Sequence, residues 1–315
     1  MTAGPEPGAS RLKGAWMALF RFHRAEPAPA AAGLAGLLDG ASIEVTPRTA
    51  AKVPDFRPLL PAGTRVYIAH VQGTPIDDMV ATAARLRAEG FEPMPHFPAR
   101  LIAGRAELAD WIARYRDRAD VRQALVLGGG VARPAGSYDS AMQLLESGLF
   151  DGFDRLHVAG HPEGNRDIDP DGSDENVMAA LRWKQDFSRR SDAQMAIVTQ
   201  FAFEAAPVIA WADRLAAEGI DLPIHLGVAG PAKLQTLIKF AIACGVGPSL
   251  RVLQRRAADV TRLLLPHEPT DLLTDLAAHK ARRPDMGIQA VHLFPLGGIA
   301  ASATWLAEQA GPRKG

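Results

Sequence analysis

Short apolar runs rich in β-branched residues alternate with longer segments of helical periodicity along most of the chain. Such runs are typical of buried strands, and the longer periodic segments are typical of helices. The predicted strands are residues 42–46, 65–70, 92–97, 123–127, 154–159, 195–200, 223–228 and 290–294. The predicted helices between them are residues 75–89, 106–118, 140–146, 174–189, 204–218 and 231–243.

The alternation of eight strands with helices favours an α/β fold of the (β/α)8 (TIM) barrel type over an open sheet. We expect residues 41–312 to form this single barrel, with a helical insertion at 250–281 before the last strand. Residues 1–40 are expected to be a partly disordered N-terminal extension. Within it we expect helices at 12–23 and in the Ala-rich stretch that ends at Leu38.

Composition narrows the function classes. The chain has 315 residues, of which 47% are hydrophobic, and its 35 basic residues balance 35 acidic ones. Such a chain has no net field that attracts nucleic acid or an anionic membrane, and no stretch reaches the ~18 apolar residues of a membrane span. We therefore expect a cytoplasmic protein without nucleic-acid or membrane partners. Cys244 is the only cysteine, so disulfides and cysteine-metal sites are excluded and a buried, inert thiol is expected.

Functional side chains of a (β/α)8 barrel lie at the C-terminal ends of its strands. Every barrel has polar residues there, so position alone is a weak signal. The polar and turn residues at or just beyond these ends are Glu44, His70, His96, Gly128, Gly129, Gly130, His161, Asn165, Gln200, the turn at 227–230 and the turn after Phe294.

Glu44 is the strongest single candidate, because it is an acidic residue within a short apolar strand that ends at Pro47. A carboxylate in such a strand is costly unless it is hydrogen-bonded, paired or protonated. Desolvation would raise its pKa and make it a better acid near neutral pH. The alternative is a structural ion pair with Arg48 or another arginine, and the residues alone do not separate the two interpretations.

Gln200 ends a predicted strand and is followed by Phe201 and Phe203. An amide beside aromatic rings could bind a heterocycle by hydrogen bonds and stacking. The alternative, favoured for the residue taken alone, is a side chain that caps the next helix. His70 and His96 could serve as acid or base groups, although a strand-end histidine is more often a structural hydrogen-bond donor.

Two further motifs have simple structural interpretations. Gly128, Gly129 and Gly130 lack both the dinucleotide fingerprint and the phosphate-loop pattern, so they indicate a tight turn or a close approach of backbone to a ligand. The Asp-rich segment 167–174 does not have the spacing of an EF-hand. We expect a solvated acidic loop there and no metal site.

Five strand-end motifs, in order and at family-like spacings, resemble methylenetetrahydrofolate reductase in its short bacterial form. The resemblance covers about residues 43–305. The motifs in this chain are Ile43-Glu-Val-Thr-Pro-Arg48, His96, Val158-Ala-Gly-His-Pro-Glu-Gly-Asn165, Val198-Thr-Gln-Phe-Ala-Phe-Glu204 and His292-Leu-Phe-Pro-Leu-Gly297.

The resemblance implies that NADH or NADPH reduces bound FAD, which then reduces 5,10-methylenetetrahydrofolate to 5-methyltetrahydrofolate. It implies that Glu44 is the general acid and that Gln200 hydrogen-bonds the pterin and the nicotinamide amide. It leaves the oligomeric state open, with a homo-oligomer as one option. The implied flavin contacts are His70, His96, Gly128, Gly129, Gly130, Ala159, His161, Asn165 and Lys184, and the implied substrate pocket contains Gln200, Leu234, Phe294 and Leu296.

The chain departs from the family pattern around the cofactor. Gly130 stands where an acidic residue is usual, His161 and Asn165 replace a tyrosine and a histidine, Leu234 replaces an aromatic residue and Gly298 replaces an arginine. Three alternatives therefore stay open: direct hydride transfer from NADH without flavin, a related barrel that acts on another one-carbon carrier, and a non-catalytic folate- or flavin-binding module.

Overall fold

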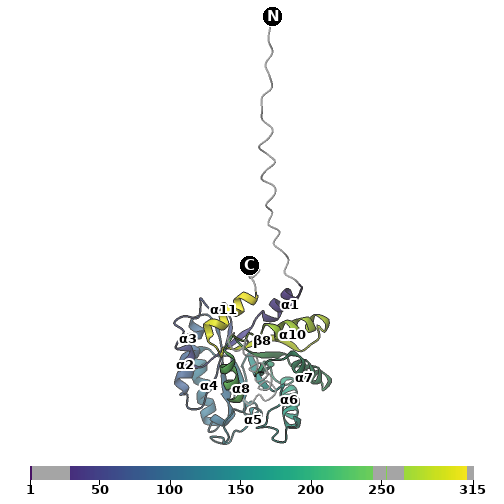
Figure 1. The fold of residues 1–315 in the computed structure, drawn as a ribbon. Coiled ribbons are helices and arrows are strands. Elements are labelled where there is room, and N and C mark those ends of the chain that lie inside the picture. Colours follow the sequence, from purple (N-terminus) through teal and green to yellow (C-terminus); the bar gives the residue numbers. More distant parts are fainter. Residues whose placement is uncertain (2–28, 244–252, 254–265, 311–315) are drawn as a thin grey trace.

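Eight parallel strands form a closed barrel in the computed structural model, in the order β1 to β8 with β8 pairing back to β1. The structure describes residues 1, 29–243, 253 and 266–310. The predicted (β/α)8 architecture is confirmed (Figure 1). The strands are β1 Ser42–Val45, β2 Arg65–Ile68, β3 Glu92–Pro98, β4 Gln123–Leu127, β5 Arg155–Gly160, β6 Gln194–Ala202, β7 Ile224–Ala229 and β8 Ile288–Phe294.

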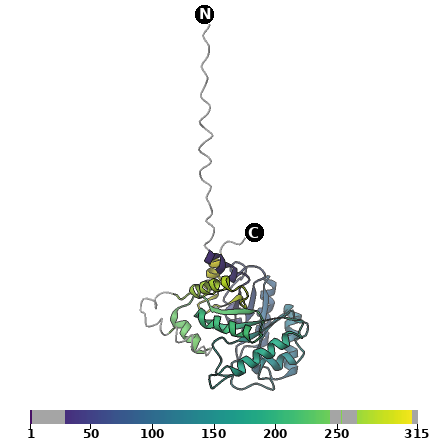
Figure 2. The same ribbon diagram turned by 90° about the vertical axis from the view of Figure 1, so that its right-hand side faces the viewer.

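Helices lie between the strands and cover the barrel. α1 packs against α10 and α11, and Figure 2 shows this group from the side. The helices are α1 Pro29–Leu38, α2 Pro47–Ala50, α3 Ile76–Ala88, the 3-10 helix η1 Ala99–Leu101, α4 Arg105–Ala119, α5 Ala141–Glu146, α6 Glu175–Ser188, α7 Ala205–Ala217, α8 Leu234–Ala243, α10 Thr270–Arg282 and α11 Ile299–Ala310.

The sequence pattern located these elements well but not their ends. The Ala-rich helix that ends at Leu38 is confirmed as α1, and α10 falls largely within the expected insertion. β6 runs two residues beyond its predicted end, through a shift in its register with β7. The predicted helix at 12–23 and Cys244 lie outside the described residues.

Strand alternation separates two cores. Ile43 and Val45 of β1 belong to the main core under the helices, so Ser42 and Glu44 face the barrel interior. The interior has its own apolar cluster, formed by Tyr67, Met94, Leu125 and Val198 with Leu127 packed against it. The barrel is therefore filled by side chains, with its polar groups set among apolar ones.

A polar network lies at the opposite, N-terminal end of the barrel interior. The Arg65 guanidinium donates to Gln123 Oε1 at 2.8 Å, and the Gln123 amide donates to Glu92 Oε2 at 2.9 Å. Arg87 pairs with the other Glu92 oxygen at 2.9 Å. These residues satisfy one another, which fits the structural role usual for this end of a TIM barrel.

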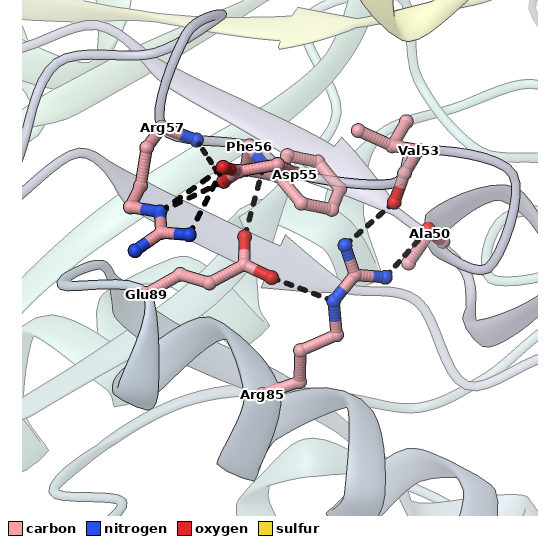
Figure 3. Close-up of polar contacts among 7 residues, drawn as sticks. All are labelled: Ala50, Val53, Asp55, Phe56, Arg57, Arg85 and Glu89. Carbon is pink, nitrogen blue, oxygen red and sulfur yellow. Dashed lines mark hydrogen bonds and ion pairs between the residues drawn. The ribbon is translucent and has the colours of Figure 1, made fainter.

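Arg85 and Glu89 of the α3 region hold the connection between α2 and β2 (Figure 3). Arg85 donates to the carbonyl oxygens of Ala50 and Val53 at 3.0 and 2.5 Å, and to Glu89 Oε1 at 2.7 Å. The second Glu89 oxygen accepts from the Phe56 backbone N–H at 2.9 Å, and the Arg85 guanidinium lies over the Phe56 ring. One ion pair therefore fixes three backbone positions of this connection.

Candidate functional site

Glu44 contacts two histidines at the mouth of the barrel. Its Oε2 lies 3.3 Å from His96 Nε2 on β3 and 3.7 Å from His292 Nε2 on β8. The Glu44 side chain is 19% exposed, so it reaches the mouth without being freely solvated. Both neighbours are imidazoles, which differs from the arginine pair considered as an alternative for this residue.

The ionisation of Glu44 differs from the sequence-based expectation. Burial by itself would raise the pKa of Glu44, but the imidazole N–H groups of His292 and His96 outweigh it and lower the pKa to about 2. The expected rise in this pKa is therefore wrong, because burial was considered without the two histidines. At neutral pH the resting group is a carboxylate, so a proton that it donates must first reach it from a neighbour.

His292 is held by groups that the sequence analysis did not single out. Its Nδ1 lies 2.9 Å from the Ser42 hydroxyl, which faces it across the β1–β8 pairing. Its ring centroid lies 4.3 Å from that of Tyr67 on β2. Burial lowers the pKa of His292, while Glu44 opposes that change. The signal in the sequence was two-residue spacing, since Ser42 precedes Glu44 and His292 precedes Phe294 by two positions on their strands.

A second pair of buried histidines continues inward from Tyr67. The Tyr67 hydroxyl lies 2.5 Å from His157 Nδ1 on β5, and the His157 ring is 4.7 Å from that of His225 on β7. Burial, followed by repulsion from His225 and nearby arginines, lowers the pKa of His157 well below its usual range. Burial likewise lowers the pKa of His225 to about 4. Both rings are thus neutral near pH 7, and neither was predicted as part of the site.

Gln200 has a buried acceptor with no partner among the described residues. Its side-chain Oε1 receives no hydrogen bond. The residue at the N-cap of α7 is Glu204, so Gln200 does not fill the capping position considered as its alternative role. An orphaned buried amide oxygen is unusual unless a ligand or water completes it.

Gln200 and Glu44 are linked through close packing on one side of the mouth. A Cβ at Gly227 would lie 2.7 Å from both Gln200 O and the Phe294 ring, so only glycine allows these two to come together. The Phe294 ring is in turn 4.7 Å from the ring of His292, the neighbour of Glu44. Glu44 and the Gln200 backbone, from which the predicted amide projects, therefore lie on the same side of the barrel mouth.

The predicted substrate residues lie in one apolar cluster beside this face. Leu234 is 3% exposed in a cluster with Phe201 and Phe203, and partly exposed Phe294 and Leu296 pack against it. The rings of Phe201 and Phe294 meet edge to face at 5.6 Å. Leu234 is thus buried within this cluster, whereas Phe294 and Leu296 are its partly exposed neighbours.

The predicted cofactor residues on β5 and α6 centre on a buried lysine. Lys184 is 6% exposed, and its ammonium donates to the Ala159 carbonyl at 3.2 Å. Burial lowers the pKa of Lys184 to about 8. Burial, together with the Lys184 charge, lowers the pKa of His161 to about 4. A buried cation with a single carbonyl contact is suited to an anionic ligand.

His70 and the glycine turn lie after β2 and β4. His70 Nε2 lies 3.0 Å from the Thr74 carbonyl, its ring packs on Trp111, and its Nδ1 is buried without a hydrogen-bond partner among the described residues. Gly129 has φ +92, and a Cβ there would lie 3.1 Å from Pro98 Cβ. The tight-turn interpretation holds at Gly129, while the space at Gly130 is open.

The Asp-rich loop is less solvated than its composition suggests. Asp169 is 1% exposed and accepts hydrogen bonds from the backbone of Asn176 and Val177 at the start of α6. The prediction of a solvated acidic loop is therefore wrong for Asp169, because its carboxylate replaces the missing partners of a helix N-terminus. Asn165 Oδ1 is used locally and accepts from the Asp167 backbone at 2.9 Å.

A surface hollow beside this loop does not contain Glu44. This one has a volume of about 420 Å³ and is lined by Pro162, Glu163, Gly164, Gly172, Ser173, Asp174 and Pro207. The candidate site is identified by its titratable groups and by buried polar atoms without a described hydrogen-bond partner, and not by a deep surface hollow. Within the described ranges, no group of three or more His, Cys, Asp or Glu side chains is arranged to hold a metal ion. Nor is any helix in those ranges long and apolar enough to span a membrane.

Comparison with known proteins supports the fold. No protein-family model matches the chain. A solved structure of an uncharacterized protein from Clostridium thermocellum, described as binding two copies of 5-methyl-5,6,7,8-tetrahydrofolic acid, has a TM-score of 0.53 at 11% identity and covers 86% of this chain and 95% of its own. The carboxyl transferase domain of Rhizobium etli pyruvate carboxylase has a TM-score of 0.38 at 10% identity, covering 83% of this chain and 50% of its own.

Proposed function

We propose that the chain binds a tetrahydrofolate and, more specifically, uses NADH or NADPH to reduce 5,10-methylenetetrahydrofolate to 5-methyltetrahydrofolate. The observation that carries the proposal is the Glu44–His96–His292 cluster at the mouth of a TIM barrel, with the unpartnered Gln200 amide on the same face. Support for the ligand class comes from the structural neighbour described as binding a methylated tetrahydrofolate.

In the proposed reaction, protonation of the substrate precedes hydride transfer. The five-membered ring of methylenetetrahydrofolate opens to a reactive iminium cation when its N10 is protonated. Glu44 is ionised at rest, so the donated proton passes through Glu44 Oε2 from His96 or His292. Once N10 has left, the Glu44 carboxylate stabilises the cation electrostatically.

Gln200 provides the orienting contact. The pterin ring carries N–H donors, and so does the nicotinamide carboxamide. Either can supply the hydrogen bond that Gln200 Oε1 does not receive from any described residue. Phe294 and Leu296 offer an apolar wall for the flat ring, and the heterocycle would lie between this wall and the acid.

The residues present fit FAD as a resident cofactor. The Lys184 ammonium donates to the Ala159 carbonyl and has further N–H groups that could bind a phosphate. His70 Nδ1 has no hydrogen-bond partner among the described residues, and the backbone at Gly130 leaves open space. His96, Gly128, Gly129, Ala159, His161 and Asn165 complete the proposed contact set. Bound FAD would supply hydride transfer to the methylene carbon, and the protein would supply the proton and the orientation.

One anaerobic absorbance titration tests the proposal. The purified protein should show a flavin spectrum that NADH bleaches and that methylenetetrahydrofolate restores. A colourless protein that still oxidises NADH in a folate-dependent manner would replace FAD chemistry with direct hydride transfer, an outcome consistent with Gly130 and with the local engagement of Asn165. Absence of both turnover and calorimetric binding with reduced folates would refute the proposal.

A further inference from the structure

We propose that Arg65 and Arg155 bind a small oxyanion, of the size and charge of phosphate or sulfate, at the N-terminal mouth of the barrel, where the strands begin. Each is the first residue of its strand, β2 and β5, so the site lies at the opposite end of the barrel from the C-terminal mouth that holds Glu44. The inference goes beyond the proposed function and does not depend on it, because it involves no folate, flavin or pyridine nucleotide.

Both arginines face the barrel interior. The residues that follow them, Val66 and Leu156, belong to the main core under the helices. Because side chains alternate along a strand, Arg65 and Arg155 lie on the inner side. Both residues are partly exposed, so a dissolved anion can reach them.

The contacts of neighbouring residues bring the two arginines to the same part of the interior. Two positions further along the strands, the Tyr67 hydroxyl of β2 lies 2.5 Å from His157 Nδ1 of β5, so side chains of these two strands meet across the barrel. At the strand starts, Arg65 Nε donates to Gln123 Oε1 at 2.8 Å. Gln123 is the register partner of Arg155 on the adjacent strand β4. The group that holds Arg65 therefore lies one strand spacing, about 4.8 Å, from the backbone of Arg155.

The described residues leave most donors of this arginine pair without a partner. Arg155 makes no side-chain hydrogen bond or ion pair with any of them, and Arg65 uses only its Nε. The carboxylate of Glu92 is engaged elsewhere, because one oxygen pairs with Arg87 and the other accepts from Gln123. Two guanidinium groups thus share one end of the barrel without a carboxylate between them.

The electrostatics of the surrounding groups agree with this geometry. Burial lowers the pKa of Arg65, and the charge of Arg155 adds to that effect. Burial also lowers the pKa values of His157 and His225, and both arginines contribute in the same direction. An oxyanion held between the guanidinium groups would relieve the repulsion, and each planar fork can donate two parallel hydrogen bonds to it. A cation or a neutral ligand would gain neither effect.

Thermal unfolding of the full chain in increasing inorganic phosphate tests the site, with ionic strength held constant by sodium chloride. The thermal midpoint of the wild type should rise by roughly 3 °C or more and reach a plateau, because a ligand that binds only the folded chain stabilises it. Arg155→Gln should show no such saturable rise. Without phosphate this variant should unfold at no lower a temperature than the wild type, since it loses no described side-chain contact and is relieved of repulsion from Arg65.

Three further variants control for charge and location. Arg122→Gln removes a charge at the same end of the barrel, from an exposed arginine that pairs with Asp120, and should keep the wild-type response. Lys184→Met removes the ammonium of the proposed cofactor site and should keep it as well. Arg155→Lys retains the charge without the planar fork, so the plateau should require roughly tenfold more phosphate.

Histidine NMR locates the bound phosphate. The ring signals of His225, assigned by their loss in His225→Gln, should shift with phosphate in the wild type and in Lys184→Met but not in Arg155→Gln. An equal rise in thermal midpoint in the wild type and Arg155→Gln would be a general salt effect and would overturn the site. The absence of any rise in the wild type would do the same. Folate binding and turnover are measured separately, so a failure of the proposed function leaves this site untouched.

Discussion

The acid side and the proposed cofactor side of the barrel mouth are built from different parts of the fold. On the acid side, Ser42, Glu44, Tyr67 and His292 all project from strands, and each has a neighbour that fixes its orientation. On the proposed cofactor side, Lys184 donates to one backbone carbonyl among the described residues, and the surrounding turns carry the departures from the family pattern.

This difference separates what the barrel itself determines from what its loops can change. Strand alternation and register place Ser42 beside His292 and Glu44 beside Tyr67, whatever the loops contain. The loops after β4 and β5 tolerate replacement at little cost to the fold. Proton chemistry should therefore be the more robust property, and cofactor choice the more variable one.

Glu44→Gln tests the catalytic role of the acid side and has the largest expected effect. We expect kcat to fall by roughly two to four orders of magnitude, because the amide can neither relay a proton nor stabilise the cation. Folate binding, measured by calorimetry, should persist within a few-fold. Wild-type kcat in this variant would mean that the acid side has no catalytic role.

Lys184→Met tests the cofactor side. Loss of the buried ammonium should weaken binding of a phosphate-bearing cofactor by roughly tenfold or more, as expected for a lost charge-assisted contact. At saturating cofactor kcat should change little. Lys239→Met, on the α8 surface, is the matched charge control and should bind the cofactor like the wild type. Equal cofactor affinity in both variants would remove Lys184 from the site.

Gln200→Ala tests whether the Gln200 side chain binds the ligand or only supports the fold. The amide oxygen has no hydrogen-bond partner within the part of the chain that the structure describes, so its removal should not lower the thermal midpoint. The dissociation constant for reduced folate should rise about tenfold through the lost hydrogen bond. A variant with weaker folding but unchanged folate affinity would make Gln200 a structural residue.

The smallest expected effect is on stability in mild acid. The pKa of His225 is lowered to about 4 in the folded protein from an ordinary value of 6.5, so its neutral form is retained on folding. Stability from this group is complete above pH 6.5 and is lost as the pH falls toward 4, because only the unfolded chain takes up the proton. His225→Gln should flatten the fall in thermal midpoint across that range, and a slope identical to the wild type would contradict this assignment.

The sequence predicted the barrel, its eight strands and Glu44 and Gln200 at one face, because periodicity and strand order determine which positions face the interior. It did not predict the ionisation of Glu44. That property depends on His292, which is 248 positions away along the chain (44 to 292) and becomes a neighbour only when the barrel closes. Tyr67, His157 and His225 were missed for the same reason, since each lies on a different strand and only the closed barrel brings them together.

The Arg85–Glu89 pair has a consequence for proteolysis. Trypsin could cut after Lys52 in the connection before β2, but cleavage requires about ten residues of that connection to leave the surface together. Arg85 holds the carbonyls of Ala50 and Val53, and Glu89 holds the Phe56 amide, on either side of Lys52. The rate of nicking there should report the opening of this single ion pair, and so the moment at which the first strand of the barrel begins to separate from the second.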